Sequence, residues 1–308
     1  MLATIYRSTG SWYSAKAENG VVYNARMKGV FKIDNINSTN PVAVGDIVDI
    51  EPEDAQSKNA IINEIHERSN YIARSSPRHK KQHHIIASNL NQALLIVTLK
   101  EPKTSQGFID RCAIAAEAYH IPPIIVFNKT DIYKNKEWEV FEKLQHIYNA
   151  IGYKVFKTSM KTFEGLKEVQ QILHQKTTLI FGHSGTGKST FINYLLPGTQ
   201  LRTKEVSGWS GKGMHTTTFA EMFDLPEGGT IIDTPGIREF AINDMKREEL
   251  SHYFPEMRLF LQDCRFNNCL HIEEPGCAVK RAVEDEKIPM ERYISYYNIL
   301  QSIAEAGY

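Results

Sequence analysis

One segment constrains the fold of this chain more than any other. Residues 182–189 read GHSGTGKS and match the pattern G-x-x-x-x-G-K-[ST]. The apolar run Leu179–Phe181 precedes the segment, and a helical pattern follows it. In that context, glycines let backbone N–H groups converge on phosphate oxygens at the positive end of a helix. The segment predicts an α/β domain that binds a nucleoside triphosphate, although more than half of the chain precedes it.

The residues of this phosphate loop have separate expected roles. The ammonium group of Lys188 adds positive charge over the outer phosphates, and the hydroxyl of Ser189 suits a Mg²⁺ ligand. The predicted nucleotide-binding residues of the loop are Gly182, His183, Ser184, Gly185, Thr186, Gly187, Lys188, Ser189 and Thr190.

A second motif, FNKTD at 127–131, indicates which base is bound. The carboxylate of Asp131 can accept hydrogen bonds from N1–H and the 2-amino group of guanine. Adenine has neither donor, so it would leave that carboxylate unpaired. Asn128 can hold the other edge of the ring, the stem of Lys129 can lie across its face, and Thr130 completes the loop. The alternative is an accidental turn, which the neighbouring phosphate loop disfavours.

Two further segments complete the parts of a GTPase. IIDTPG at 231–236 is expected to bring Asp233 to a magnesium ion and the N–H of Gly236 to the γ-phosphate. The hydroxyl-rich loop SGKGMHTTT at 210–218 is of the type that closes over both. One of its three threonines should bind the metal; spacing does not decide which, and Thr217 is favoured.

Hydrolysis also needs an oriented water. Many GTPases place a glutamine directly after the D-x-x-G motif, but this chain has Ile237, which can neither donate nor accept a hydrogen bond. Slow intrinsic hydrolysis, accelerated by a partner, is therefore predicted. His215 is the candidate for positioning the water; alternatively it is an exposed loop residue or a partner contact. In KTSM, a backbone N–H near Ser159 is expected to reach the guanine oxygen.

The order of these motifs is reversed from the usual one. The base-reading motif comes before the phosphate loop, which predicts a circularly permuted α/β GTPase domain over residues 69–242. Continuous apolar runs between helical stretches predict a mostly parallel sheet that is covered on both faces. The expected strands are 93–99, 123–128, 177–182 and 229–234, and the expected helices are 108–120, 137–152 and 163–174.

Residues 1–68 contain about five short strands between turn residues, which predicts an all-β barrel of the OB or SH3-like kind. The barrel is either a structural cap or an RNA-binding module. The basic, aperiodic run 74–84 is interpreted as a solvated linker, with phosphate contact as the alternative. The side chains that would form an RNA-binding face are Tyr13, Tyr23, Arg26 and Lys28.

Residues 243–308 predict a mainly helical region around a structural zinc ion, since three thiols and one imidazole fall within 264–277. Unliganded thiols are the alternative. Cys112 lies apart and is expected to pack in a helix. The predicted ligands are Cys264, Cys269, His271 and Cys277. One stripe of the last helix is expected to be core: Tyr293, Tyr296, Tyr297 and Leu300.

Composition excludes several classes of protein. The formal net charge is zero, so a nucleic-acid contact must be local. No apolar run is long enough to span a membrane, and the first residues do not resemble a secretory signal. The few cysteines favour a metal site in a reducing compartment over disulfides, which predicts a cytoplasmic protein.

The whole arrangement resembles one family, the ribosome small-subunit-dependent GTPases called RsgA or YjeQ. The motifs that carry the resemblance are NKTD, the phosphate loop, GKGMHTTT, DTPG and the terminal cysteines. The resemblance implies an OB barrel, a permuted GTPase domain and a zinc domain. It also implies late maturation of the 30S subunit, contact with 16S rRNA, and hydrolysis of GTP to GDP and phosphate stimulated by that subunit. It supports the role of His215 in catalysis.

Two rival interpretations remain at this level. In one, the chain is a nucleotide-gated RNA-binding protein in which hydrolysis only resets the bound state. In the other, it is a small-molecule kinase, which shares the phosphate loop but does not account for NKTD, DTPG or the cysteines. A monomer is expected in either case.

Overall fold

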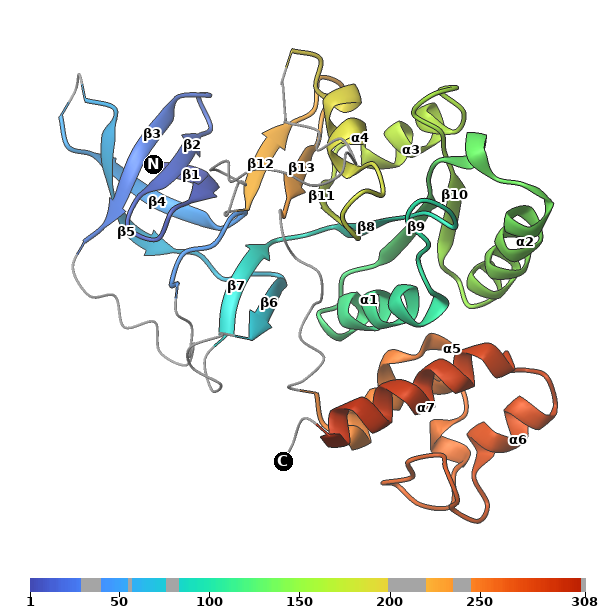
Figure 1. Ribbon diagram of the computed structural model, residues 1–308. Coiled ribbons are helices and arrows are strands. Elements are labelled where there is room, and N and C mark those ends of the chain that lie inside the picture. Colours follow the sequence, from blue (N-terminus) through green and yellow to red (C-terminus); the bar gives the residue numbers. More distant parts are fainter. Residues whose placement is uncertain (29–39, 55–56, 76–82, 199–219, 235–244, 306–308) are drawn as a thin grey trace.

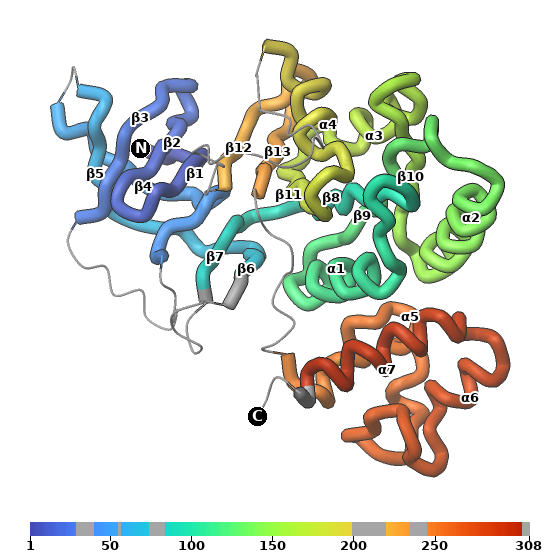
Figure 2. The backbone as a smooth tube through the Cα atoms, viewed as in Figure 1, coloured from blue at the N-terminus to red at the C-terminus, as the bar shows by residue number. Residues whose placement is uncertain are grey.

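The computed structural model describes residues 1–28, 40–54, 57–75, 83–198, 220–234 and 245–305. Figure 1 shows a β-barrel, a central sheet flanked by helices, and a helical region that lies against helix α1. The tube in Figure 2 shows that the chain passes from the barrel to the far edge of the sheet and then returns to strands beside the barrel. Among the helices of the described residues, none is long and apolar enough to cross a membrane.

The barrel closes through antiparallel pairs and one parallel pair, in the order β1-β2-β3-β5-β4 and back to β1. This closure leaves no open edge within the barrel and is the arrangement of an OB fold. Alternate side chains point inward, and small alanines among them fit a narrow interior. The strands are β1 (Leu2–Ser8), β2 (Tyr13–Ala17), β3 (Val22–Met27), β4 (Ile47–Pro52) and β5 (Asn59–Ile65).

The structure corrects one expectation about the barrel surface. Tyr13 is only 2% exposed, and its hydroxyl donates to the carbonyl of Gly10 (3.0 Å), so its ring belongs to the core. It shares the inward phase of Ala15 and Ala17. Of the other expected face residues, Tyr23 is half-buried, whereas Arg26 and Lys28 are exposed.

The basic run 74–84 is not a plain linker, because both of its ends belong to an antiparallel hairpin. Strand β6 (Tyr71–Ser75) pairs with β7 (His83–Ser88), while 76–82 lie outside the described residues. The apolar residues that bury this hairpin lie mostly outside the basic run, which is why the run alone gave no strand signal. Arg68, just before the hairpin, forms a buried ion pair with Asp46 of the barrel (2.6 Å).

The central sheet has the order β10-β9-β8-β11-β13-β12, parallel except for β12. The strand that leads into the phosphate loop, β11, lies in the middle of this sheet, although three of its other strands precede it in the chain. That arrangement confirms the permuted order. The strands are β8 (Gln92–Val97), β9 (Pro123–Phe127), β10 (Lys154–Lys157), β11 (Thr177–Phe181), β12 (Glu221–Asp224) and β13 (Thr230–Asp233).

Helices cover both faces of this sheet, as the apolar strands predict. Helices α1 and α2 pack on one face with Leu95, Ile125 and Phe127, and helices α3 and α4 pack on the other with Leu94 and Ile124. Their bounds are α1 (Gln106–Ala118), α2 (Asn135–Ala150), α3 (Leu166–Leu173) and α4 (Lys188–Leu195).

Strand β12 joins the sheet to the barrel. It pairs antiparallel with β1 at Arg7 and Glu221, so the described strands of the two regions form one continuous sheet of eleven. Sequence patterns missed β12, because in its four residues only Met222 is buried.

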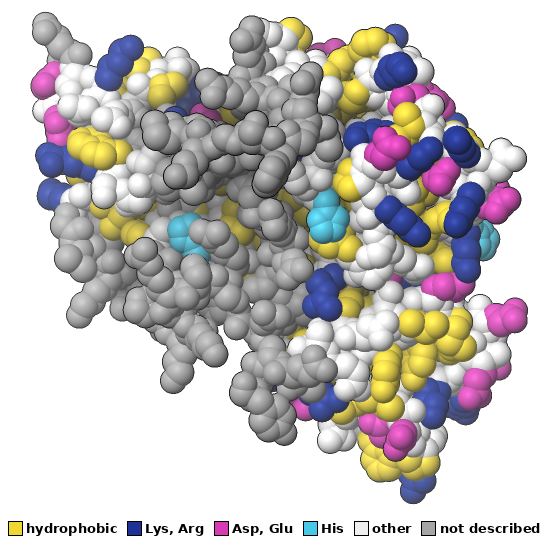
Figure 3. Space-filling model, viewed as in Figure 1, with side chains coloured by type: hydrophobic (Ala, Val, Ile, Leu, Met, Phe, Trp, Pro, Cys, Tyr) yellow, Lys and Arg dark blue, Asp and Glu magenta, His cyan; other side chains and the backbone are white. Residues whose placement is uncertain are grey.

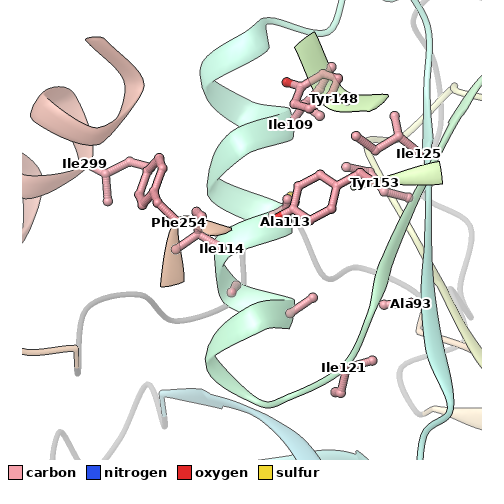
Figure 4. Packing of buried hydrophobic residues seen from close by; sticks show 14 of the residues in the cluster. Ala93, Ile109, Ala113, Ile114, Ile121, Ile125, Tyr148, Tyr153, Phe254 and Ile299 are labelled. Carbon is pink, nitrogen blue, oxygen red and sulfur yellow. The ribbon is translucent and has the colours of Figure 1, made fainter. Parts of the chain in front are cut away.

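The C-terminal region packs on α1 and carries α7 (Met290–Glu305). Figure 4 shows Phe254 and Ile299 of this region against Ile114 of α1, while Tyr148 and Ile125 lie on the opposite side of that helix. One hydrophobic core therefore continues from the sheet through α1 into the C-terminal region. The other elements of this region are the 3₁₀ helices η2 (Arg247–Tyr253) and η3 (Leu261–Asp263) and the helices α5 (Pro255–Arg258) and α6 (Ala278–Glu284), and a further 3₁₀ helix, η1 (Thr130–Ile132), follows β9 in the central domain.

Two details of this region differ from expectation. Residues 246–257 carry apolar residues at helical spacing, which predicts one helix, but the helix breaks at Phe254, which is extended because a proline follows it. The predicted stripe is also wrong at one residue, since Tyr296 and Leu300 are buried but Tyr297 is 41% exposed. Figure 3 shows hydrophobic side chains on the surface of this region. The large exposed ones here are Leu259, Phe266, Met290, Ile294 and Tyr297.

Candidate nucleotide and metal sites

The predicted nucleotide-binding motifs follow four parallel strands. NKTD follows β9, the TSM segment follows β10, the phosphate loop follows β11, and Asp233 ends β13. Carboxyl ends of parallel strands meet at one edge of a sheet, where α/β proteins bind ligands. The fold thus gathers at one edge motifs that are far apart in the chain.

Two glycines of the phosphate loop have positive φ angles and lie too close to a neighbouring atom to carry a Cβ. Gly182 has φ +140°, and a Cβ there would lie 2.2 Å from the carbonyl oxygen of Ile96. Gly187 has φ +98°, and a Cβ there would lie 2.3 Å from Nδ2 of Asn128. Gly187 is also the residue before α4, which begins at Lys188. The loop therefore turns tightly into a helix whose first N–H groups face the site.

Lys188 is held inside the loop. Its Nζ donates to the carbonyls of Gly182 (2.6 Å) and His183 (2.5 Å). Burial lowers the pKa of Lys188, and the nearby charge of Asp233 opposes that shift. Burial in turn raises the pKa of Asp233, which Lys188 partly offsets. The ammonium group of Lys188 and the carboxylate of Asp233 thus interact in a partly desolvated site, as their predicted phosphate-binding and magnesium-binding roles would require.

Asn128 is a hub between the base motif and the phosphate loop. Its Nδ2 donates to the carbonyl of Thr186 (2.8 Å), and its Oδ1 accepts from the hydroxyl of Thr158 (3.1 Å). Its backbone N–H donates to Val97 (2.8 Å), and its carbonyl accepts from the hydroxyl of Tyr133 (3.1 Å). Every polar group of this residue is bonded and its side chain is 2% exposed, so the two motifs are locked together.

Asp131 is oriented by Ser159, whose hydroxyl donates to Oδ1 of Asp131 (2.7 Å). That hydroxyl accepts the N–H groups of Lys161 and Thr162 (3.2 and 3.1 Å). The N–H of Ser159 itself donates to the carbonyl of Glu164 (3.1 Å). A guanine contact from a backbone N–H near Ser159 would therefore fall to a neighbouring amide, and Ser159 acts on the carboxylate instead.

Lys129 has a left-handed backbone, with φ +63°. Its Nζ donates to the carbonyl of Glu101 (2.5 Å), in the loop between β8 and α1. Thr130 is buried and donates through its hydroxyl to the carbonyl of Thr158 (3.1 Å). Sequence patterns did not predict that Tyr133 and Thr158 support the guanine motif through hydrogen bonds. Their positions in the chain, close to NKTD and to Ser159, were the only indication of this role.

Of the remaining predicted residues, some lie in the described part of the chain and others do not. His183 stacks on Phe108 at the start of α1, with ring centroids 3.6 Å apart, and Thr186 is buried in the loop. Ser184 and Gly185 lie in the turn of the loop, while Ser189 and Thr190 lie in the first turn of α4. Three predicted residues lie outside the described part of the chain: His215, Thr217 and Gly236.

The four predicted metal ligands meet in the C-terminal region. One ligand atom from each of Cys264, Cys269, His271 and Cys277 lies within 4.8 Å of the others, so the cluster can hold a metal ion. Backbone N–H groups of Ala278 and Lys280 donate to the sulfurs of Cys264 and Cys277 (3.4 Å each). Burial raises the pKa of the Cys269 thiol to about 12, which means that burial disfavours the charged thiolate. A bound cation would reverse this effect, because it stabilises the thiolate.

Comparison with known proteins agrees with this geometry. The model of the RsgA GTPase family matches residues 65–243, and that of the RsgA N-terminal domain matches residues 3–62. The chain belongs to the RsgA GTPase family. A curated family member, the small ribosomal subunit biogenesis GTPase RsgA of Bacteroides fragilis (strain YCH46), is 47% identical over 308 residues, which are 100% of this chain and 99% of that protein.

Solved structures of RsgA-like proteins share the fold. The crystal structure of YjeQ from Thermotoga maritima has a TM-score of 0.80 and 31% identity, covering 98% of each chain. The structure of YloQ, described as a circularly permuted GTPase, has a TM-score of 0.76 and 29% identity, covering 99% of this chain and 95% of that one. The barrel, the permuted order and the GTP-hydrolysing class expected from the sequence are confirmed.

Proposed function

We propose that this chain hydrolyses GTP to GDP and phosphate during late maturation of the small ribosomal subunit, and that the subunit stimulates this activity. The observation that carries the proposal is the bonding of Asn128, which ties the guanine motif to the phosphate loop through Thr186. The name of the Bacteroides fragilis relative supports the ribosomal role. A cytoplasmic monomer that contacts 16S rRNA fits the same role, with Arg26 and Lys28 as exposed cations on the barrel.

The base is read by the motif that follows β9. Asp131, held by Ser159, accepts hydrogen bonds from N1–H and the 2-amino group of guanine. The stem of Lys129 covers the ring. Since adenine offers neither donor, ATP would leave the Asp131 carboxylate unpaired, and this difference supplies the selectivity.

Phosphate binding and hydrolysis depend on the other half of the site. Lys188 and the N–H groups of the phosphate loop stabilise charge on the transferred group. A Mg²⁺ ion bound with GTP, which Ser189, Thr217 and Asp233 would hold, supplies further charge neutralisation. His215 would orient the attacking water, a role that Ile237 cannot take. Intrinsic turnover is therefore slow.

We propose zinc as the metal of the Cys/His cluster, in a structural role. Bond lengths of about 2.3 Å to sulfur and about 2.0 Å to nitrogen place tetrahedral ligand atoms roughly 3.5–3.8 Å apart. Nδ1 of His271 lies 3.7 Å from the sulfur of Cys264 and 3.3 Å from that of Cys277, close to that spacing. Four protein ligands leave no open position for catalysis.

The test is steady-state hydrolysis of GTP and ATP, each with and without purified small ribosomal subunits. The proposal expects slow GTP turnover that rises strongly with small subunits, and no comparable ATP turnover. Equal use of ATP, or GTP turnover that small subunits do not change, would contradict it. A His215→Ala variant should bind GTP normally but lose the stimulated turnover, and normal stimulated turnover would remove His215 from the mechanism.

A further inference from the structure

Three consecutive residues of the loop between β8 and α1 form hydrogen bonds to the guanine motif or to the residues that follow it. The hydroxyl of Tyr133 accepts the N–H of Leu99 (3.0 Å). Nζ of Lys100 donates to the carbonyl of Ile132 (3.4 Å). Nζ of Lys129 donates to the carbonyl of Glu101, as described above. This loop therefore packs against the turn that carries the guanine motif and supports it, although the loop contains none of the motifs that identify a GTPase.

Of the three side chains that make these hydrogen bonds, only that of Tyr133 is buried. It is 8% exposed, and its ring packs edge-on against Trp138, with centroids 5.6 Å apart. Its hydroxyl is used in both directions, because it accepts from Leu99 and donates to the carbonyl of Asn128 (3.1 Å). Burial raises the pKa of Tyr133 to about 12, so the hydroxyl keeps its proton at physiological pH.

The carbonyl of Asn128 belongs to the peptide that leads into Lys129. Lys129 is left-handed, a backbone conformation that a residue with a side chain holds only when its surroundings enforce it. A hydrogen bond to the preceding carbonyl fixes the orientation of that peptide. Without this bond the peptide can rotate and Lys129 can relax. The turn that carries Asp131 would then shift relative to the phosphate loop.

We propose that Tyr133 is a positioning residue for guanine recognition: through the carbonyl of Asn128, it holds the turn that places Lys129 over the base and Asp131 at its edge. The inference rests on the proposed GTP site and adds a determinant of base selectivity. It requires no contact between Tyr133 and the nucleotide. Because the base is common to GTP and GDP, Tyr133 should affect the binding of both equally.

The test compares Tyr133→Phe with wild type by calorimetric binding of GDP and inosine diphosphate and by GTP turnover, and it also measures the binding of ADP to wild type. Inosine diphosphate keeps N1–H but lacks the 2-amino group. The variant should bind GDP about tenfold more weakly, as for one lost buried hydrogen bond. Its preference for GDP over inosine diphosphate should shrink, and KM for GTP should rise with kcat unchanged. The matched control is Tyr13→Phe, which loses a buried hydroxyl bond to a carbonyl in the barrel core and should leave all three readouts unchanged.

The outcomes separate this inference from the proposed function. A wild-type protein that does not prefer GDP to ADP contradicts the proposed function. A wild-type preference for GDP together with an unchanged ratio of GDP to inosine diphosphate in Tyr133→Phe overturns only the role of Tyr133. An equal loss for both nucleotides also overturns it, since that indicates a structural effect alone. If Tyr133→Phe does not fold at the assay temperature, the binding comparison is made at a lower temperature at which it folds: a smaller preference for GDP over inosine diphosphate supports the inference, and an unchanged preference overturns it.

Discussion

The central domain meets its two neighbours in physically different ways. At the β12 edge, Asp224 accepts from the hydroxyl of Tyr6 (2.6 Å) and from Nζ of Lys16 (2.5 Å), and its side chain is 51% exposed. At the α1 face, Arg292 pairs with Asp110 (2.5 Å) and Glu256 (2.6 Å), and the side chain of Arg292 is fully buried. One contact is solvated, whereas the other lies in the core that Figure 4 shows around α1.

The difference indicates which junction can be broken at a small cost in the free energy of unfolding. Exposed ion pairs contribute roughly 0–1 kcal/mol, because water and salt compete for the same groups. Removing one partner of a buried pair costs about 3–5 kcal/mol, because a charge is left without compensation. The β12 contact can therefore be exchanged without unfolding, while the C-terminal region is fixed to α1. The barrel would stay attached through a buried bond to the hairpin, in which the hydroxyl of Ser88 in β7 donates to Asp46 of the barrel (2.6 Å).

The two junctions also lie next to different parts of the predicted nucleotide site. Strand β12 follows the segment that contains Thr217 and precedes β13, which ends at Asp233. The weak junction is therefore next in sequence to the expected magnesium ligands. The strong junction involves α1, whose first turn carries Phe108 against His183 of the phosphate loop.

Loss of the metal should break the α1 junction most completely. Zinc binding supplies about 10–16 kcal/mol in small zinc-binding peptides, more than this region can replace by packing. A Cys277→Ser variant should lose its zinc, and hydrogen exchange should show 245–305 unprotected while the barrel stays protected. The control Cys112→Ala, changed in α1, should keep one zinc per chain. Normal protection in zinc-free Cys277→Ser would contradict a structural metal.

Breaking the buried ion network should have the next largest effect. Arg292→Met leaves Asp110 and Glu256 buried without a cation, so the free energy of unfolding should fall by about 3–5 kcal/mol in urea titrations. Replacing all three residues by apolar ones of similar size should recover most of that loss. A change below about 1 kcal/mol in the single variant would show that the α1 junction is no stronger than the β12 edge.

The smallest effect is expected at the β12 edge. Asp224→Asn weakens both bonds of an exposed group, so the free energy of unfolding should fall by at most about 1 kcal/mol, and less at high salt. Glu227→Gln is the control, because Glu227 forms no ion pair with a described residue. A loss as large as that of Arg292→Met would remove the contrast between the junctions.

The sequence predicted elements that carry their own signal. The apolar runs before NKTD and the phosphate loop identified β9 and β11, and the three cysteines and one histidine within 264–277 identified a cluster that can hold a metal ion. Long-range pairing was not predictable. Arg292 lies within an amphipathic helix and looks like a surface residue, yet its partner Asp110 is 182 positions away.

Two local orientations, of the Tyr13 ring and of the Ser159 N–H, were also not predicted from the sequence. Tyr13 was assigned to the surface because an aromatic residue in a strand can face either way, and only the closed barrel decides. The hydrogen bond from the N–H of Ser159 to the carbonyl of Glu164 was also not predictable, because it depends on the turn that follows Ser159. In both cases tertiary contacts, rather than propensity, determined the orientation.

The most direct test of the account is calorimetric binding of GDP and xanthosine diphosphate to wild type and Asp131→Asn. Xanthine carries an oxygen where guanine carries its 2-amino group, so an asparagine amide can donate where the aspartate accepted. We expect the variant to bind GDP at least about 100-fold more weakly, because it loses the negative charge and the hydrogen bond from the 2-amino group, which would then face the asparagine NH2 group. We also expect it to gain affinity for xanthosine diphosphate. Unchanged GDP affinity in Asp131→Asn would contradict the assignment of this permuted site to guanine nucleotides.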